Sequence, residues 1–113
     1  MSDRVPKLIL IDLLDAISNI MEFTDGMDFN AFDKDKKTVA AVERYFEIIG
    51  EASRQLPESF ILDHTDIEWH KMISFRNVLI GEYFRIERQI EWNIIKNTLP
   101  RLKQKLEMLS SVL

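Results

Sequence analysis

Apolar residues recur every three or four positions along most of the chain, the spacing that places them on one face of an α-helix. Four helical segments follow from this pattern, over residues 4–23, 32–56, 65–80 and 87–113. Each segment has one stripe of expected core positions: Leu10, Leu14, Ile17 and Met21; Val42, Tyr45, Phe46, Ile49, Ala52 and Leu56; Met72, Ile73, Phe75, Val78 and Leu79; Ile90, Ile94, Leu102, Leu106 and Leu109. We therefore predict an all-α antiparallel bundle of four to five helices, forming a single domain over residues 1–113.

Helix-breaking and helix-capping residues set the expected ends of these segments. Thr24-Asp25-Gly26 ends the first segment after Phe23, and Pro57 stops the second. Thr65 and Glu68 have the spacing of a capping box, which predicts that the third segment begins there. Pro100 removes a backbone donor inside the fourth segment, so this segment should kink or restart near it.

The composition narrows the class of protein. The chain has 113 residues, of which 46% are hydrophobic and only three are glycine. Cysteine is absent, which excludes disulfides, thiolate zinc sites and cysteine nucleophiles. The apolar stretch over residues 8–20 is interrupted by Asp12 and Asp15, so it predicts neither a signal peptide nor a membrane span. A cytoplasmic protein without a membrane partner is expected.

The net charge of −4 conceals two halves of opposite sign. Residues 1–68 hold 7 basic and 15 acidic side chains, whereas residues 69–113 hold 8 basic and 4 acidic ones. The positive half could attract phosphate, because such attraction depends on the local field. The alternative is two ordinary solvated helix faces of opposite sign.

The motifs of several enzyme classes are missing. The sequence contains no GxGxxG, Walker loop, HExxH or GxSxG motif. Neither His64 nor His70 follows a glutamate by three residues, as the di-iron bundles require. We therefore expect no metal site and no cofactor. His64 falls in a loop and His70 points away from Arg76, so each is expected to be a surface or interface histidine.

One stretch, residues 75–84, reads Phe-Arg-Asn-Val-Leu-Ile-Gly-Glu-Tyr-Phe. It resembles the signature of the HEPN superfamily, which has an Arg, four to six residues, a His, one residue and a Tyr. The HepT branch opens this signature with Arg-Asn. Arg76, Asn77 and Tyr83 match it, whereas Gly81 stands where the histidine belongs.

The resemblance to the HepT branch extends along the chain. Residues 41–52 resemble the second helix of the family with its Ile-Gly-Glu-Ala core. Glu68-Trp69 and Leu99-Pro100 lie where the family has similar residues. The resemblance implies the fold of a HEPN-type bundle and a homodimer whose paired motifs face one cleft.

The resemblance also implies a function and roles for the matching residues. Such proteins are metal-independent endoribonuclease toxins, each neutralised by an MntA-like nucleotidyltransferase antitoxin that adds AMP to the motif tyrosine. By this match, Arg76 binds and polarises the RNA phosphate, Asn77 supports it, and position 81 supplies the acid–base group. Tyr83 is the AMP acceptor. RNA, rather than DNA, is the expected substrate.

Helical geometry limits how these groups can meet. At about 100° per residue, Arg76 and Tyr83 nearly eclipse on a straight helix, whereas position 81 lies roughly 140° from Arg76. Either the helix distorts or ends near residues 80–81, or a second subunit completes the site. The sequence leaves both open.

Glycine cannot transfer a proton, so Gly81 predicts little or no RNase activity for this chain. Three explanations of Gly81 stay open: a deliberate replacement of histidine that allowed a toxic protein to be produced, a naturally inactive homologue, and a helix-terminal glycine that matches by coincidence. The competing function is a non-catalytic helical subunit that docks with a nucleotidyltransferase, and a third is a simple dimerising scaffold.

Overall fold

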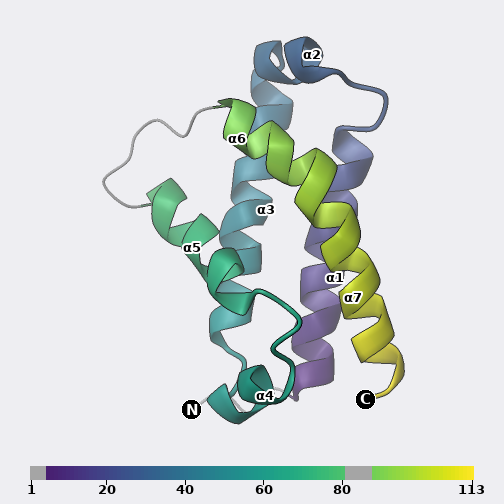
Figure 1. The fold of residues 1–113 in the computed structure, drawn as a ribbon. Helices are drawn as coiled ribbons and strands as arrows, with labels where there is room; N and C mark the ends of the chain where they lie inside the picture. The colour runs from purple at the N-terminus through teal and green to yellow at the C-terminus, as the bar shows by residue number, and fades with distance from the viewer. Residues whose placement is uncertain (1–4, 81–87) are drawn as a thin grey trace.

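A computed structural model describes residues 5–80 and 88–113, without the side chains of 76–80. Every regular element in these ranges is helical (Figure 1). The elements are α1 (Pro6–Phe23), α2 (Phe29–Lys34), α3 (Lys36–Arg54), α4 (Glu58–Asp63), α5 (Trp69–Ile80), α6 (Arg88–Asn93), the π-helix η1 (Ile94–Thr98) and α7 (Leu99–Ser111). The predicted all-α class is confirmed.

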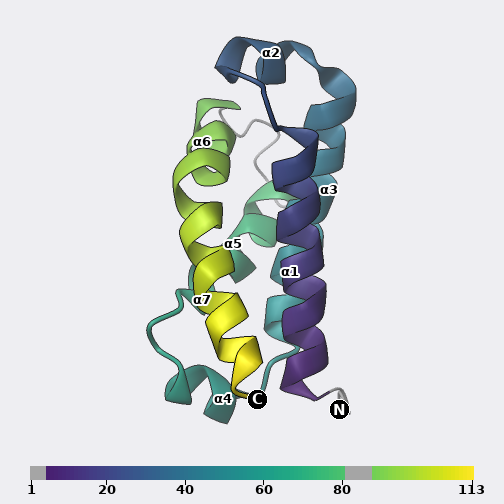
Figure 2. The same ribbon diagram turned by 90° about the vertical axis from the view of Figure 1, so that its right-hand side faces the viewer.

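The long helices lie side by side and alternate in direction. The chain ascends through α1, turns at α2, descends through α3 and ascends again through α5 (Figures 1 and 2). It then descends through α6, η1 and α7, so that the start of α1 and the end of α7 lie at the same end of the bundle. The Lys7 ammonium lies 3.5 Å from the carbonyl oxygen of Leu113. Helix α3 packs against both α1 and α5, and α1 also packs against α7.

The core is formed by one cluster of buried apolar side chains: Ile9, Leu10, Leu13, Ala16, Ile17, Ile20, Phe32, Val39, Val42, Phe46, Ile49, Ala52, Leu56, Ile67, Trp69, Met72, Trp92, Ile95, Leu99, Leu102, Leu106 and Leu109. The stripe predicted for the second segment is buried in this cluster, except for the half-buried Tyr45. The prediction that Ile90 is a core position is wrong, because its side chain is 50% exposed. The buried side chains in this part of the chain are instead those of Trp92, Ile95 and Leu99.

Two short helices were not predicted, and one of them divides the expected second segment. Asp35 ends α2 and also caps α3, where its carboxylate accepts a hydrogen bond of 3.1 Å from the Thr38 amide. Its extended backbone cannot continue the α2 helix into α3. Asp28 caps α2 in the same way, accepting from the Ala31 amide at 2.8 Å. Pro57 precedes the other short helix, α4.

The third segment begins later than predicted. Helix α5 starts at Trp69, so the start expected at Thr65 is wrong. The intervening residues turn so that Ile67 enters the core beside Trp69, whose amide donates to the Ile67 carbonyl at 3.0 Å. The predicted core positions Val78 and Leu79 lie outside the described side chains.

The fourth segment is interrupted just before Pro100, as predicted. Residues 94–98 form a π-helix, in which the Leu99 amide donates to the carbonyl of Ile94. This wider turn accommodates a stretch in which proline supplies no backbone donor. The wider turn also rotates the residues before it relative to α7, and the apolar face before Pro100 accordingly passes through Trp92 and Ile95.

Candidate functional site

The motif begins in the last part of α5 and continues into the next segment. Arg76 and Asn77 are part of the α5 helix, but their side chains lie outside the described residues. Gly81 and Tyr83 also lie outside them. The expectation that these four residues form one site therefore remains a prediction, as do the two ways in which the groups could meet.

The helix that carries the start of the motif is held firmly against α3. The ring of Phe75, which precedes Arg76 in the chain, packs against Phe46 of α3 with ring centroids 5.4 Å apart. Met72 is buried in the same interface. At the start of α5, the Trp69 indole donates a hydrogen bond of 3.0 Å to the carbonyl of His64. These contacts fix the direction of α5, the helix that contains residue 76.

The chain re-enters the described fold at Arg88, which begins α6. Its guanidinium lies 3.6 Å from a carboxylate oxygen of Asp33 in α2 and 3.9 Å from one of Glu43 in α3. It also lies 4.0 Å from Glu91, three residues along its own helix. These distances exceed those of hydrogen bonds, so the attraction is one of charge. Arg88 thus ties the far end of the motif segment to α2 and α3.

Glu91 is the most unusual ionisable group in this cluster. Its side chain is 1% exposed, and neither carboxyl oxygen receives a hydrogen bond in the described part of the chain. Burial raises the pKa of Glu91 to about 8, Glu43 adds to the rise, and Arg88 opposes it. With a pKa of about 8, Glu91 is mostly protonated at neutral pH. It can then donate a hydrogen bond to the Glu43 carboxylate.

This cluster was not predicted from the sequence. A weak signal was present, because Arg88 and Glu91 have the i, i+3 spacing of a helical ion pair. Glu91 also precedes Trp92, which stacks on Phe32 of α2 with ring centroids 5.2 Å apart. The burial of Glu91 depends on this packing of distant segments, which the local pattern does not reveal.

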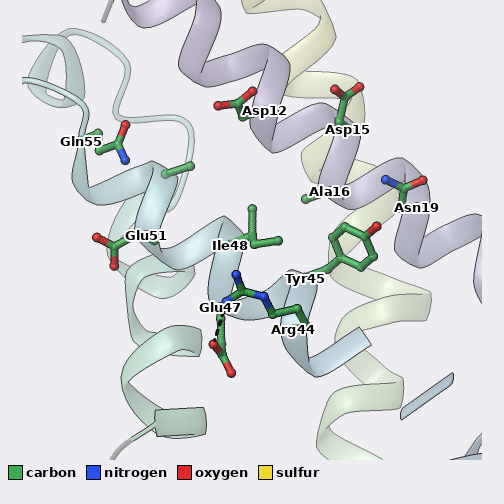
Figure 3. A pocket seen from close by; sticks show the side chains of 11 residues that line it. Asp12, Asp15, Ala16, Asn19, Arg44, Tyr45, Glu47, Ile48, Glu51 and Gln55 are labelled. Atoms are coloured by element: carbon green, nitrogen blue, oxygen red, sulfur yellow. Dashed lines mark hydrogen bonds and ion pairs between the residues drawn. The ribbon is translucent and has the colours of Figure 1, made fainter. Parts of the chain in front are cut away.

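A large hollow lies between α1 and α3, away from the α5 face of α3 (Figure 3). Its volume is about 460 Å³. The carboxylates that line it are Asp12, Asp15, Glu47 and Glu51. Arg44, the basic residue among the described residues of the lining, forms an ion pair of 3.2 Å with Glu47. This acidic surface repels phosphate, so the hollow does not suit an RNA strand.

The two histidines are placed where the sequence predicted. His70 is exposed on α5, and its carbonyl accepts a hydrogen bond from the Ser74 hydroxyl at 2.8 Å. His64 ends α4 and its ring lies against Phe60, with ring centroids 4.5 Å apart. Within residues 5–80 and 88–113, no group of three or more His, Asp or Glu side chains is arranged to hold a metal ion. None of the described helices combines the length and the apolar character needed to cross a bilayer.

Comparison with known proteins decides the family. A family model described as Ribonuclease HepT-like matches residues 13–109, a range that contains the whole motif. The chain belongs to the HepT-like ribonuclease family. This family agrees with the HEPN-type helical bundle described above.

Relatives of similar length support the same assignment. The protein "Putative RNase MJ1380" of Methanocaldococcus jannaschii is 38% identical over 96% of this chain and 99% of its own length. "Probable ribonuclease HepT" of Thermococcus cleftensis is 42% identical over 94% of this chain and 96% of its own length. "Putative RNase MJ0127", also of M. jannaschii, is 41% identical over 89% and 84%. No solved structure matches the chain at a comparable level of significance.

Proposed function

We propose that this chain is the toxin component of a toxin–antitoxin pair, built on the scaffold of a metal-independent endoribonuclease. The observation that carries the proposal is the match to the HepT-like family across a range that contains Arg76 and Tyr83. The chain as it stands is catalytically inactive, because Gly81 occupies the position of the acid–base histidine.

The proposed reaction defines what each motif residue contributes. A base removes the proton of the RNA 2′-hydroxyl, and the 2′-oxygen forms a bond to the adjacent phosphorus. The bond from phosphorus to the 5′-oxygen breaks, and an acid protonates that oxygen. Arg76 binds the phosphate with paired, charge-assisted hydrogen bonds, while Asn77 supports it. A histidine at position 81 would transfer the protons, because imidazole titrates near neutral pH.

Tyr83 is the proposed site of regulation by an MntA-like nucleotidyltransferase antitoxin. The phenolic oxygen attacks the α-phosphorus of ATP, a bond from oxygen to phosphorus forms, and pyrophosphate leaves. The phenolic proton passes to a base of the antitoxin. The added AMP places negative charge and bulk where an RNA phosphate would bind. Because Tyr83 is intact, the chain remains a substrate for this modification despite Gly81.

The proposed assembly is a homodimer in the cytoplasm, in which the two motifs face one cleft and RNA is the substrate. The positive balance of residues 69–113 supports the attraction of RNA to this half of the chain. The experiment that tests the function restores histidine at position 81. The Gly81→His protein should cleave RNA in the presence of EDTA, and its toxicity in cells should be relieved by the antitoxin.

Gly81 favours a second candidate function, a non-catalytic helical subunit that docks with a nucleotidyltransferase. This subunit would present Tyr83 or a nucleotide-binding surface without cleaving RNA. The native codon at position 81 and the neighbouring reading frame separate the two functions. A native glycine codon supports the non-catalytic subunit, whereas a native histidine codon supports the nuclease.

A further inference from the structure

A second, smaller hollow lies between the start of α5 and α7. It has a volume of about 130 Å³. Among the described side chains, three cationic ones line it, Lys71 from α5 and Arg101 and Lys105 from α7. On α7, Arg101 and Lys105 are four residues apart and therefore lie on one flank of the helix. This groove concentrates positive charge in a protein whose net charge is −4.

One of the three cations, Lys71, forms an ion pair with Glu68, and the charges of the other two also act on this carboxylate. The Lys71 ammonium lies 2.8 Å from a carboxylate oxygen of Glu68, and both side chains are 68% exposed. The hydrogen bond and charge of Lys71 lower the pKa of Glu68, and Lys105 and Arg101 lower it further. An exposed carboxylate thus occupies the place where the fields of three cations overlap.

The other contacts of these cations leave their charge available. Lys105 donates to the backbone carbonyl of Asp66 at 2.7 Å, and Arg101 donates to that of Asn97 at 3.2 Å. A carbonyl orients a cation but does not cancel its charge. Asp66 also lines the groove, so the described charged side chains of the lining sum to one positive charge when Glu68 is ionised.

The groove lies beside the start of the motif on α5. The half-buried Phe75 lines it and is the residue before Arg76. Lys71 and Arg76 are separated by about 7.5 Å along the α5 axis and by about 140° around it. The two positions therefore face different sides of α5, and the groove is separate from the place where Arg76 would hold a phosphate. A partly exposed aromatic ring beside cations is a surface on which a base can stack.

We propose that this groove binds a backbone phosphate of single-stranded RNA through Lys71, Arg101 and Lys105, and that Glu68 competes with this phosphate for the same cations. The proposal rests on the proposed function, because it takes RNA as the ligand. Glu68 then acts as an internal anion that the RNA phosphate displaces. Removing a cation and removing the Glu68 charge should therefore change the affinity for RNA in opposite directions. Loss of a cation weakens binding, whereas loss of the Glu68 charge strengthens it.

The test measures the binding of a short fluorescein-labelled single-stranded RNA by anisotropy, at low and physiological ionic strength, with gel analysis showing that the RNA stays intact. Lys105→Gln should weaken binding about threefold to tenfold and make the salt dependence shallower by about 0.7 in log–log slope. Lys105→Arg should restore it. Glu68→Gln should tighten binding by a similar factor. An excess of inorganic phosphate should compete only weakly, because it lacks the rest of the strand.

Lys103→Gln is the matched control, because Lys103 lies on the same helix but on the other flank of its buried stripe. This variant should bind RNA like the unmodified chain, and circular dichroism should show that every variant is folded. Equal RNA affinity for the unmodified chain, Lys105→Gln and Glu68→Gln would overturn the groove while leaving the proposed function intact. If the unmodified chain binds no RNA, both the groove proposal and the proposed function fail. If the groove binds an acidic protein surface instead of RNA, the unmodified chain, Lys105→Gln and Glu68→Gln should bind RNA with equal affinity.

Discussion

The carboxyl groups of Glu91 in α6 and Glu43 in α3 lie together beside the guanidinium of Arg88, the residue at which the described chain resumes after the motif. Two ionised carboxylates at this place would repel each other, and Glu91 would also lose its hydration. Holding one proton on Glu91 removes both costs. The link between α6 and α3 therefore depends on protonation.

This relationship predicts that stability falls as the solution becomes alkaline. The pKa of Glu91 is raised from 4.5 to about 8, so the folded state binds a proton that the unfolded state releases. The stabilising contribution is complete below pH 4.5 and is lost as the pH rises through about 8. Glu91→Gln keeps a neutral donor toward Glu43, so its free energy of unfolding should change less with pH over this range than that of the unmodified chain. Urea denaturation at several pH values measures the effect.

Glu107→Gln is the control for this prediction, since Glu107 is exposed on α7. It should leave the pH dependence of the unmodified chain in place. The free energies of unfolding of Glu91→Gln and of the unmodified chain could instead change with pH in the same way between about pH 5 and about pH 8. That result would show that Glu91 is already ionised in the folded protein and would contradict the prediction.

The stack of Phe32 on Trp92 joins α2 to α6 and should contribute strongly to stability. Phe32 is fully buried, and the two ring centroids are 5.2 Å apart. Phe32→Ala should lower the free energy of unfolding by about 3–5 kcal/mol, because it removes buried contacts and leaves a cavity. Leu62→Ala, at a side chain that is 65% exposed, should change it by less than about 0.5 kcal/mol. Similar values for both variants in urea denaturation would contradict this packing.

Asp35 should stabilise the fold through its carboxylate, because that group caps α3. Its hydrogen bond from the Thr38 amide lowers the pKa of Asp35. This contribution is present above the ordinary pKa of 3.8 and is lost as the pH falls through the lowered value. Asp35→Ala should lower the Tm at neutral pH, whereas Asp35→Ser should retain most of it. Equal Tm values for the alanine and serine variants would show that the cap is unimportant.

Tyr83 should accept AMP when the antitoxin and ATP are supplied. Mass spectrometry of the purified chain should then show the addition of AMP, and peptide mapping should place it on Tyr83. Tyr83→Phe should remain unmodified, because it lacks the acceptor oxygen, while Tyr45→Phe serves as the control tyrosine variant. An unmodified native chain in the presence of an active antitoxin would favour the dimerising scaffold.

The parts of the fold that were predicted correctly are those that depend on local periodicity. Val42, Phe46 and Ile49 repeat at helical spacing, and all three are buried. Asp35 reads as an ordinary polar position of a helix, and only its extended backbone shows that it divides two helices. Ile90 fits the apolar period of the sequence, but the π-helix that follows turns a different face toward the core.

The candidate motif residues stay predictions, and the surroundings of the motif segment could not be predicted from the sequence. Arg76, Asn77 and Tyr83 follow from the resemblance to the HepT branch, which the family match supports. The burial of Glu91 against Glu43 could not be predicted, because it results from packing between segments distant in the sequence. The groove at Glu68 was equally hidden, since its cations come from two separate helices.

The central claim, that the chain is a ribonuclease scaffold disarmed at Gly81, is tested most directly by RNA cleavage with the Gly81→His protein in EDTA. Gly81→Ala serves as the control for altered helix propensity, and Gly81→His combined with Arg76→Gln removes the phosphate ligand. We predict that Gly81→His cleaves RNA and leaves 2′,3′-cyclic phosphate and 5′-hydroxyl ends, that the alanine variant is inactive, and that the double variant is slower by about 10²–10³. A folded Gly81→His protein that cleaves no RNA would contradict the claim.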